Sequence, residues 1–473
     1  MLVVISDLHF EEEESDFLAD GNGERPYFSR DLFRRNTPAE AYRRLTAWLA
    51  AEAHRSGAQR MDLVLAGDVF DLHRTTLWFK DNPDGVRPYV SSTNVDRVLE
   101  NKVLGILAAM AAEEEVKNSL EIFRLLGNSR YLERPDGPEQ KFPAEVTLHY
   151  IPGNHDRLAN ATSSIRDQIR TLLGLNDGST AFSHVLQFED PHVLIRHGHE
   201  YDRYNFSEDY SDKDLPTQLP DQEYDDPAFG DFITVEVAAR LPSLFREEYL
   251  DSDILESEAL STLYLRLLRF DDLRPQSALL DFLLNIRTAS ELGLSQEDIW
   301  EKLVPIARNL LNDISEHQFL RDWLRGLEKS WQPDPIDAVQ VFLASRVWRG
   351  WMPLRLLRTM QNLNANAVIA ERDKTSGPER FAAREEAIRT GSPQFVVAGH
   401  THRPQVELLA ADAEGVRYYV NTGTWRNRIF STQERTGFGR LKGRAYVIFY
   451  GSGEREGALE ESFDYWDGTY RMG

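Results

Sequence analysis

The sequence predicts an α/β fold, and two features of its apolar segments lead to that class. Short runs rich in Val and Ile recur along the chain, and each ends in a cluster of polar residues. These runs are Leu2–Ser6, Asp62–Ala66, Val146–Ile151, Val193–Arg196 and Phe395–Ala398. Runs this short, bounded by Gly, are typical of buried strands. Open α/β sheets place their sites just past the carboxyl ends of such strands, so we expect the polar clusters to form one site.

A helix is predicted between the first two strands. Thr37 is expected to cap a helix that begins at Pro38, with Glu40 completing a capping box. Gly57 is expected to end this helix, because glycine readily adopts the left-handed conformation found after helices.

Two helical stretches interrupt the strand pattern and predict the domain organisation. Residues 73–143 are expected to form a smaller helical insertion, and residues 205–391 a large helical insertion or cap beside the site. The core then comprises residues 1–204 and 392–473. Helical spacing of apolar residues supports this in Val95–Leu107, Val116–Leu126, Leu255–Phe270, Gln276–Ile286 and a segment from Ser295 to near Leu311. Two further strands, Val416–Asn421 and Arg444–Tyr450, are expected after the large insertion.

The composition restricts the chemistry and the partners. The chain has 473 residues and a net charge of −23, which repels nucleic-acid phosphates at long range. Nucleic acid is therefore a disfavoured partner, although a local basic channel would still allow it. The chain contains no cysteine, which excludes disulfides, thiolate metal ligands and cysteine nucleophiles. Any metal ligand must come from His, Asp, Asn or Glu.

The apolar segments are too short to predict a membrane span. None reaches the roughly 18 residues that a span needs, and the longest candidate, Val103–Ala112, is expected to be one face of a helix. The sequence opens on a strand-like run without the basic segment of a secretory signal. We therefore expect a cytoplasmic protein.

Half of the twelve histidines lie in the polar clusters that follow the predicted strands. These are His9, His155, His197, His199, His400 and His402, and they are accompanied by Asp7, Asp68, Asp71 and Asn154. Imidazole nitrogens together with carboxylate and amide oxygens suit Mn, Fe, Zn or Ni. Asp-x-His and His-x-His pairs on an extended segment would point both side chains to the same side. The sequence therefore predicts a metal site.

The five polar clusters carry a family resemblance. They read Asp7-Leu8-His9, Gly67-Asp68-Val69-Phe70-Asp71, Gly153-Asn154-His155-Asp156, His197-Gly198-His199 and Gly399-His400-Thr401-His402. In this order they resemble the motifs of the calcineurin-like metallophosphoesterase superfamily. One motif alone is weak, but five in order, each closing an apolar run, are specific. The resemblance covers the core strands and neither insertion, and it implies a four-layer αββα sandwich with two metal ions between strand ends.

The resemblance also implies roles for individual residues. One metal ion would be held by Asp7, His9 and His402, and the other by Asn154, His197 and His400. Asp68 would bridge the two ions, since a carboxylate has two oxygens to share. His155 would be the acid near the leaving group, and Asp71 would orient it. The cofactor would be two divalent metal ions, with Mn²⁺ expected first and Fe, Zn or Ni also compatible.

The implied reaction is hydrolysis of a phosphodiester or phosphomonoester by a hydroxide that bridges the metal ions. Leu72 and His73 follow Asp71 where the protein-phosphatase branch has an Arg, so we do not expect phosphoprotein substrates. The segment Gly399–Pro404 is similar to the UDP-diacylglucosamine pyrophosphatase group, and Gly67–Asp71 to the SbcD-like nuclease branch. Because the net charge speaks against long DNA, we expect a small molecule, a nucleotide or a nucleotide-linked lipid as substrate.

Two alternative functions stay open. The first is an SbcD-like nuclease, and the second is a protein-binding scaffold that uses the large helical insertion. Scaffold members of the superfamily lack several ligands, whereas every motif position is filled in this sequence.

A few residues near the motifs allow two interpretations. His199 and Arg403 are candidates for phosphate contact, although His199 could instead support the site and Arg403 could be an ordinary exposed arginine. The segment Asn421–Arg426 is expected to form a turn or to line the site, with the turn favoured. Glu11–Glu14 is expected to be a solvated run, and Asp202 an exposed acid.

Overall fold

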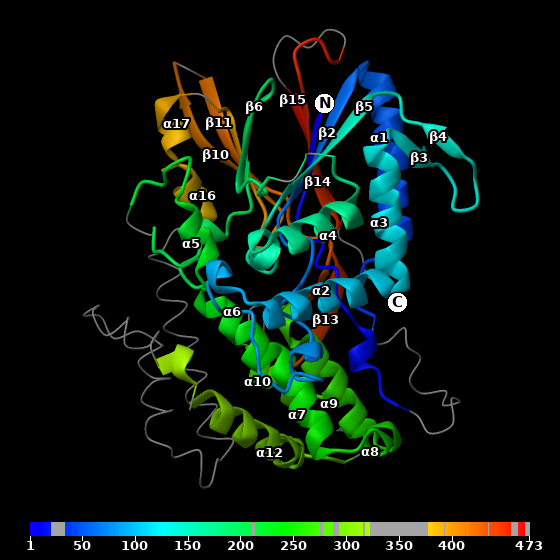
Figure 1. Ribbon diagram of the computed structural model, residues 1–473, viewed down its shortest axis with the longest axis vertical. Helices are drawn as coiled ribbons and strands as arrows, with labels where there is room; N and C mark the ends of the chain where they lie inside the picture. Colours follow the sequence, from blue (N-terminus) through cyan, green and yellow to red (C-terminus); the bar gives the residue numbers. More distant parts are fainter. Residues whose placement is uncertain are drawn as a thin grey trace.

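The chain combines two mixed β-sheets with a largely helical region, which confirms the predicted α/β class (Figure 1). The computed structural model describes residues 1–19, 34–176, 178, 180–210, 213–274, 278–286, 293–315, 317–321, 377–391, 393–413, 415–433, 435–455 and 462–468.

The first sheet has five strands in the order β15–β14–β1–β2–β5. Three of them, β1, β2 and β5, run parallel, whereas β14 and β15 are antiparallel additions on one side. The strands are β1 (Leu2–Ile5), β2 (Arg60–Ala66), β5 (Glu145–Ile151), β14 (Ala445–Tyr450) and β15 (Ser462–Asp467). The sequence predicts all of these except β15, which lies at the edge of the sheet and is only partly buried.

The second sheet also has five strands, in the order β10–β11–β9–β7–β6. Its three central strands run parallel, and its two edge strands are antiparallel. The strands are β6 (Val185–Glu189), β7 (His192–Arg196), β9 (Phe395–Ala398), β10 (Gln405–Asp412) and β11 (Gly415–Asn421). The three central strands are predicted from the sequence and the edges are not, because the edge strands carry exposed polar residues that blur the apolar pattern.

The two sheets pack face to face through one apolar layer. Alternate residues of β1 divide between two cores: Leu2 and Val4 lie in the layer between the sheets, and Val3 and Ile5 lie in the core beneath the helices. This division follows from the two-residue period of a strand, and it explains why β1 is apolar at every position. From the second sheet, Val193, Ile195, Phe395, Val397 and Val420 complete the layer.

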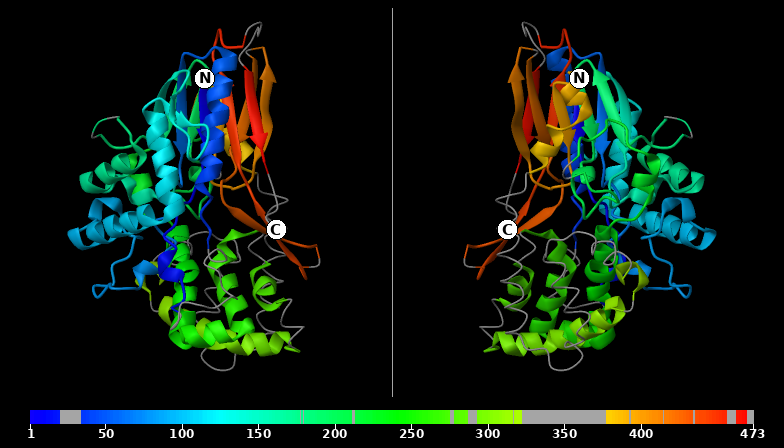
Figure 2. Two further views of the ribbon diagram at one scale, coloured as in Figure 1. Left: turned by 90° about the vertical axis from the view of Figure 1, so that its right-hand side faces the viewer. Right: turned by 90° about the vertical axis from the view of Figure 1, so that its left-hand side faces the viewer.

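Helices cover the outer face of each sheet, as the side views in Figure 2 show. The first sheet is covered by α1 (Ala39–Ser56), α2 (Arg97–Ala112), α3 (Glu114–Gly127) and α4 (Ser163–Leu173). The second is covered by α16 (Pro378–Ala382), α17 (Glu386–Thr390) and residues near α5 (Asp221–Asp225). Beneath the helices that cover the second sheet, Leu194, Val396 and Tyr419 of that sheet are fully buried.

The remaining helices lie in the lower half of the view in Figure 1, and together they form the helical region. They are α6 (Phe229–Ile233), α7 (Arg240–Glu248), α8 (Asp251–Glu256), α9 (Glu258–Arg269), α10 (Leu279–Leu284) and α12 (Gln296–Ser315). Residues 234–239 join α6 to α7 as a wider helical turn. Short strands accompany them: β8 (Leu273–Arg274), β12 (Asn427–Ser431) and β13 (Phe438–Lys442) in one sheet, and β3 (Arg130–Leu132) with β4 (Glu139–Lys141) in another. Because β8 pairs with β12, the helical region is joined directly to the segment that follows β11.

The predicted helices are found, with two differences at their ends. The segment 255–270 is two helices, because the Ser257 hydroxyl accepts the N–H of Leu260 and begins α9 there. Thr37 does not cap α1, since its hydroxyl donates to the carbonyl of Trp425. The Glu115 carboxylate instead accepts the first free N–H of α1, from Ala39, at 2.8 Å.

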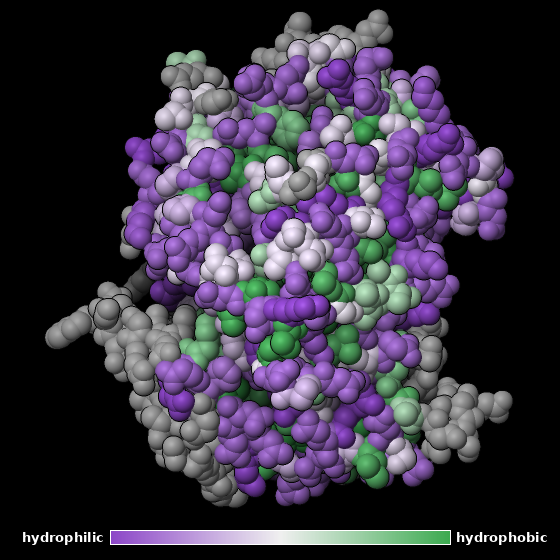
Figure 3. Space-filling view, in the orientation of Figure 1, coloured by the Kyte–Doolittle hydropathy of each residue, from purple (hydrophilic) through white to green (hydrophobic). Residues whose placement is uncertain are grey.

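Before residue 322, the described part of the large insertion is mainly helical, with irregular segments and strand β8 between the helices, and residues 322–376 lie outside the described part. The division into a core and two insertions stays a prediction. Among the described helices, none combines the length and the apolar composition needed to cross a lipid bilayer. The face shown in Figure 3 is mostly hydrophilic, with hydrophobic residues scattered over it, in keeping with the net charge of −23.

Packing between the two sheets gives a first prediction. Phe449 on β14 is fully buried, and its ring lies 4.8 Å from that of Phe395 on β9. Phe449→Ala should leave a cavity between the sheets and lower the free energy of unfolding by about 3–5 kcal/mol, measured by denaturant titration. As a control, Phe430→Ala removes a ring that is 37% exposed and should cost about 1 kcal/mol or less. Equal effects of the two substitutions would contradict the face-to-face packing.

Candidate metal centre

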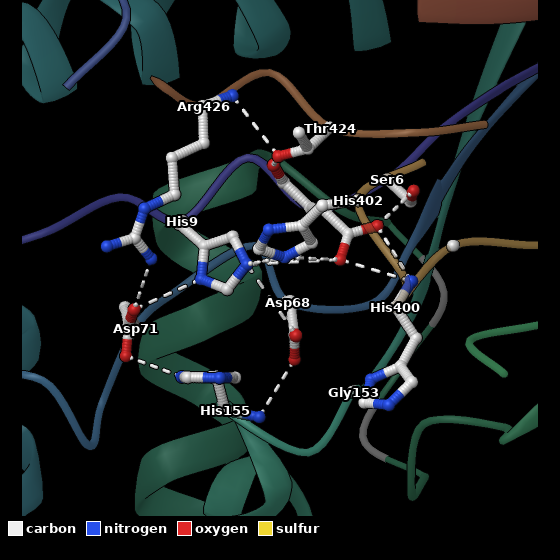
Figure 4. Close-up of polar contacts among 12 residues, drawn as sticks. Ser6, His9, Asp68, Asp71, Gly153, His155, His400, His402, Thr424 and Arg426 are labelled. Atoms are coloured by element: carbon white, nitrogen blue, oxygen red, sulfur yellow. Dashed lines mark hydrogen bonds and ion pairs between the residues drawn. The ribbon is translucent and has the colours of Figure 1, made fainter. Parts of the chain in front are cut away.

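The predicted metal ligands, together with His155 and Asp71, meet at one place, just past the carboxyl ends of the central strands of both sheets (Figure 4). Asp7 and His9 follow β1, Asp68 and Asp71 follow β2, Asn154 and His155 follow β5, His197 follows β7, and His400 and His402 follow β9. Residues separated by almost four hundred positions in the sequence therefore come into contact because five strand ends point to the same region.

The first predicted ligand group, Asp7, His9 and His402, forms a compact and buried cluster. The Nε2 atoms of His9 and His402 are 2.9 Å apart. Oδ1 of Asp7 lies 3.3 Å from Nε2 of His402 and 3.9 Å from Nε2 of His9. Three donor atoms at such separations can all bind one cation at their centre.

The second predicted ligand group, Asn154, His197 and His400, is equally close. Oδ1 of Asn154 lies 3.2 Å from Nε2 of His197 and 3.0 Å from Nδ1 of His400. His197 is fully buried, whereas the ring of His400 remains partly exposed.

Asp68 stands between the two groups. Its Oδ2 lies 3.1 Å from Nε2 of His197 in one group and 3.7 Å from Nε2 of His9 in the other. Its Oδ1 accepts the backbone N–H of His155 at 2.8 Å, which fixes the plane of the carboxylate. Asp68 thus faces an imidazole of each group.

Three of the imidazoles are oriented by a hydrogen bond from the ring nitrogen that faces away from the cluster. Nδ1 of His9 donates to Asp71 at 3.0 Å, and Nδ1 of His197 donates to the carbonyl of Ala66 at 2.9 Å. Nε2 of His400 donates to Asp202 at 3.1 Å. In a neutral ring, the nitrogen that faces the cluster then presents a lone pair to the nearby oxygens. Lone pairs that converge in this way favour a cation between them, and partners of this kind are typical of metal-bound histidines.

The backbone at the ligands is strained. Nine non-glycine residues in the described part of the chain have left-handed φ angles, and five of them are Asp7, His9, Asp68, His400 and His402. Such conformations cost about 1–3 kcal/mol each and concentrate at functional sites. The Asp-x-His and His-x-His pairs therefore do not converge by strand alternation as the sequence predicts. The strands end before them, and tight turns aim their side chains.

Two motif glycines are required by the close packing of the ligands. A Cβ atom on Gly153 would overlap Oδ1 of Asp68, and one on Gly399 would overlap the carboxylate of Asp7. Neither neighbour can move away without leaving the cluster, so any larger residue would displace a predicted ligand.

Asp156 holds two of the loops together. Its buried carboxylate accepts the backbone N–H groups of Gly153 and Val69, the latter at 2.9 Å. These bonds tie the loop after β5 to the loop after β2, and so keep Asn154 beside Asp68.

Electrostatics keep the carboxylates of the cluster ionised. Burial raises the pKa of Asp68, but the His197 and His155 imidazoles outweigh it and hold the pKa well below its usual value. The same balance, with His402 and His197 as partners, lowers the pKa of Asp7. Cation ligands must be deprotonated, and these two carboxylates meet that requirement.

The predicted proton donor lies beside the cluster. Nδ1 of His155 is 2.8 Å from Oδ1 of Asp71, and the His155 ring is 14% exposed while Asp71 is fully buried. Burial lowers the pKa of His155, but the charges of Asp71 and Asp68 outweigh it and raise the pKa well above its usual value. Asp71 also accepts from His9, so one carboxylate orients both imidazoles. The structure therefore brings His155 and Asp71 together, and their catalytic roles stay predictions.

The two candidates for phosphate contact differ in position. His199 is buried, with its ring 5.3 Å from that of His197, and burial lowers its pKa to about 3. It is therefore a neutral ring packed behind the cluster. Arg403 is exposed, and its backbone N–H bonds the Thr401 hydroxyl. The structure does not bring either side chain into the ligand groups.

Three features of the site differ from the interpretation that the sequence favours. Asp202 is a hydrogen-bond partner of His400 rather than a free surface acid. The segment Asn421–Arg426 lines the site, since the Thr424 hydroxyl bonds the Asp7 carbonyl at 2.9 Å and Arg426 reaches Asp71. Glu11–Glu13 are buried rather than solvated, because Arg35, Arg74 and Arg426 surround Glu11. Of these three features, only the contacts of Asn421–Arg426 could have been expected from the sequence, because this segment directly follows a buried strand.

The donor set fits divalent transition metals. Imidazole nitrogens with carboxylate and amide oxygens suit Mn, Fe, Zn or Ni, and the chain has no thiolate to offer. Comparisons with known proteins found no matching family model and no matching curated protein. The case for a metal centre therefore depends on the geometry of the site.

Metal binding can be tested without any substrate. The metal-free protein should bind two Mn²⁺ ions per chain, counted by elemental analysis after equilibrium dialysis, and should gain about 2.7 kcal/mol of stability per site at a hundred times the Kd of that site. His197→Ala should reduce the bound metal. His149→Ala is the control, because His149 bonds Asp62 away from the cluster. Equal metal content in both variants would contradict the assignment of His197 as a ligand.

Proposed function

We propose that the chain is a dinuclear, metal-dependent phosphoesterase of the calcineurin-like metallophosphoesterase superfamily. One observation carries the proposal: seven side chains from five strand ends form two donor groups that share the Asp68 carboxylate. The layered arrangement of helices, two facing sheets and helices is in keeping with the αββα sandwich that the resemblance implies.

Asp7, His9 and His402 would hold one ion, Asn154, His197 and His400 the other, and Asp68 both. When bound, the two ions would supply positive charge that offsets the charge developing on the phosphoryl oxygens and that lowers the pKa of a water molecule. The protein keeps these ligands in place through hydrogen bonds from outside the cluster and through the strained turns that carry them.

His155 would donate a proton to the departing oxygen. Its Nδ1–H is directed to Asp71, so Nε2 is the atom free to face a substrate. The partial exposure of the ring agrees with this role, since a proton donor must reach the substrate. A small molecule, a nucleotide or a nucleotide-linked lipid is the substrate class we propose, because the net charge of −23 disfavours long nucleic acids.

Hydrolysis of bis(p-nitrophenyl) phosphate in the presence of Mn²⁺ tests the proposal. Substitution of partners outside the ligand set typically costs 10–100-fold in such sites, so Asp68→Ala, which removes the shared ligand itself, should lower kcat/KM by more than about 100-fold. Asp62→Ala is the matched control, because Asp62 lies on β2, the strand that precedes Asp68, but outside the site. Full activity of the Asp68 variant would exclude a bridging role.

The same assay, run with other substrates, separates the alternatives. Single- and double-stranded DNA are compared with nucleotides and small phosphodiesters under equal metal loading. Strong cleavage of DNA that falls with added salt would favour the nuclease. A protein that binds no metal and cleaves none of these substrates would favour the scaffold.

A further inference from the structure

Arg426 is a buried arginine at the centre of a group of carboxylates beside the candidate metal centre. It lies in the segment after β11, is 3% exposed, and its guanidinium group points to Asp71 (Figure 4). Nη1 lies 3.2 Å from Oδ2 of Asp71, Nη2 lies 2.9 Å from Glu11, and Nε lies 2.7 Å from Oδ1 of Asp272. One planar side chain thus contacts acidic residues from three separate segments, through hydrogen bonds to Asp71 and Asp272 and an ion pair with Glu11.

Asp71 links this arginine to the predicted proton donor. Oδ2 accepts from both Arg426 and His9, and Oδ1 accepts from His155 at 2.8 Å and from the backbone N–H of Arg74 at 3.1 Å. With four donors around it, the carboxylate has a single orientation. Since Arg426 is the only one of them that comes from the C-terminal part of the chain, it fixes Asp71 relative to the second sheet.

Asp272 brings the helical region into this arrangement. It follows α9 and immediately precedes β8, and its side chain is fully buried. Arg74 contacts the same carboxylate at 3.5 Å and donates to the carbonyl of Leu268 in α9. The helical region is therefore connected to His155 by a continuous series of charged contacts, from Asp272 through Arg426 to Asp71.

We propose that Arg426 is a positioning residue for His155, acting through Asp71, and that Asp272 of the helical region holds Arg426 in place. This inference rests on the proposed function, because it assigns His155 as the proton donor. A lysine cannot replace the arginine, since one ammonium group cannot donate to both Asp71 and Asp272 in the same geometry and keep the ion pair with Glu11. The helical region thus contributes to the reaction centre of the core.

Leaving-group dependence separates positioning from general destabilisation. Proton donation matters for a poor leaving group and little for a good one. Methyl phenyl phosphate and methyl p-nitrophenyl phosphate are compared with Mn²⁺-loaded protein. Arg426→Lys should lower kcat for the phenyl ester at least about 10-fold more than for the p-nitrophenyl ester, with KM and metal content unchanged. Asp272→Asn, which keeps the arginine, should change the ratio of kcat for the two esters in the same direction, but by a smaller factor.

The matched control is Arg74→Lys. Arg74 is also buried and contacts Glu11 and Asp272, but its side chain does not reach Asp71, so this substitution should leave the ratio of the two esters unchanged. In the His155→Ala background, Arg426→Lys should have no additional effect on the ratio. Equal losses on both esters, a changed ratio in the Arg74 variant, or additive effects with His155→Ala would each overturn the proposal.

A second measurement does not depend on activity. In histidine-labelled protein, the Nδ1 proton of His155 that bonds Asp71 should give a downfield resonance, assigned by its loss in His155→Ala. This resonance should weaken in Arg426→Lys and persist in Arg74→Lys. An inactive wild-type protein that shows these changes would refute the proposed function and retain the positioning role. A resonance that is unaffected by Arg426→Lys would refute the positioning role, whatever the activity.

Discussion

The shared carboxylate of Asp68 is the constraint on which the arrangement of the site depends. It faces imidazoles from both donor groups, and its second oxygen is held by the backbone of His155. A buried carboxylate is costly unless opposite charge surrounds it, and the histidines of both sheets provide that environment. The sheets must therefore pack with their strand ends in register, and the layer of Val, Ile and Phe residues between them keeps that register.

The loops around Asp68 adopt strained backbone conformations that allow the ligands to converge. Left-handed φ angles at five predicted ligands, and glycines that admit no Cβ atom, are tolerated because the surrounding structure holds them. Asp156 ties two of these loops together, and Arg426 ties Asp71 to the helical region. The helical region is thus connected to Asp71 through Arg426.

Much of this could be predicted from the sequence, because buried strands and short polar motifs leave local signals. The central strands lie within two residues of their predicted bounds, and the predicted metal ligands meet, whereas His199 and Arg403 do not join the ligand groups. Edge strands, the Asp202 partner and the Glu11–Arg426 network were missed, since they depend on contacts between distant segments that no local pattern encodes. The prediction that strand alternation points Asp7 and His9 to the same side is wrong. Both residues have left-handed φ angles, so turn geometry directs their side chains.

The central claim is that two cations share the Asp68 carboxylate. The most direct test is anomalous diffraction at the manganese edge from crystals grown with Mn²⁺. The account predicts two peaks roughly 3.5–4 Å apart on either side of Asp68, one coordinated by Asp7, His9 and His402 and the other by Asn154, His197 and His400. No peak at Asp68, or a single peak that Asp68 does not coordinate, would contradict it.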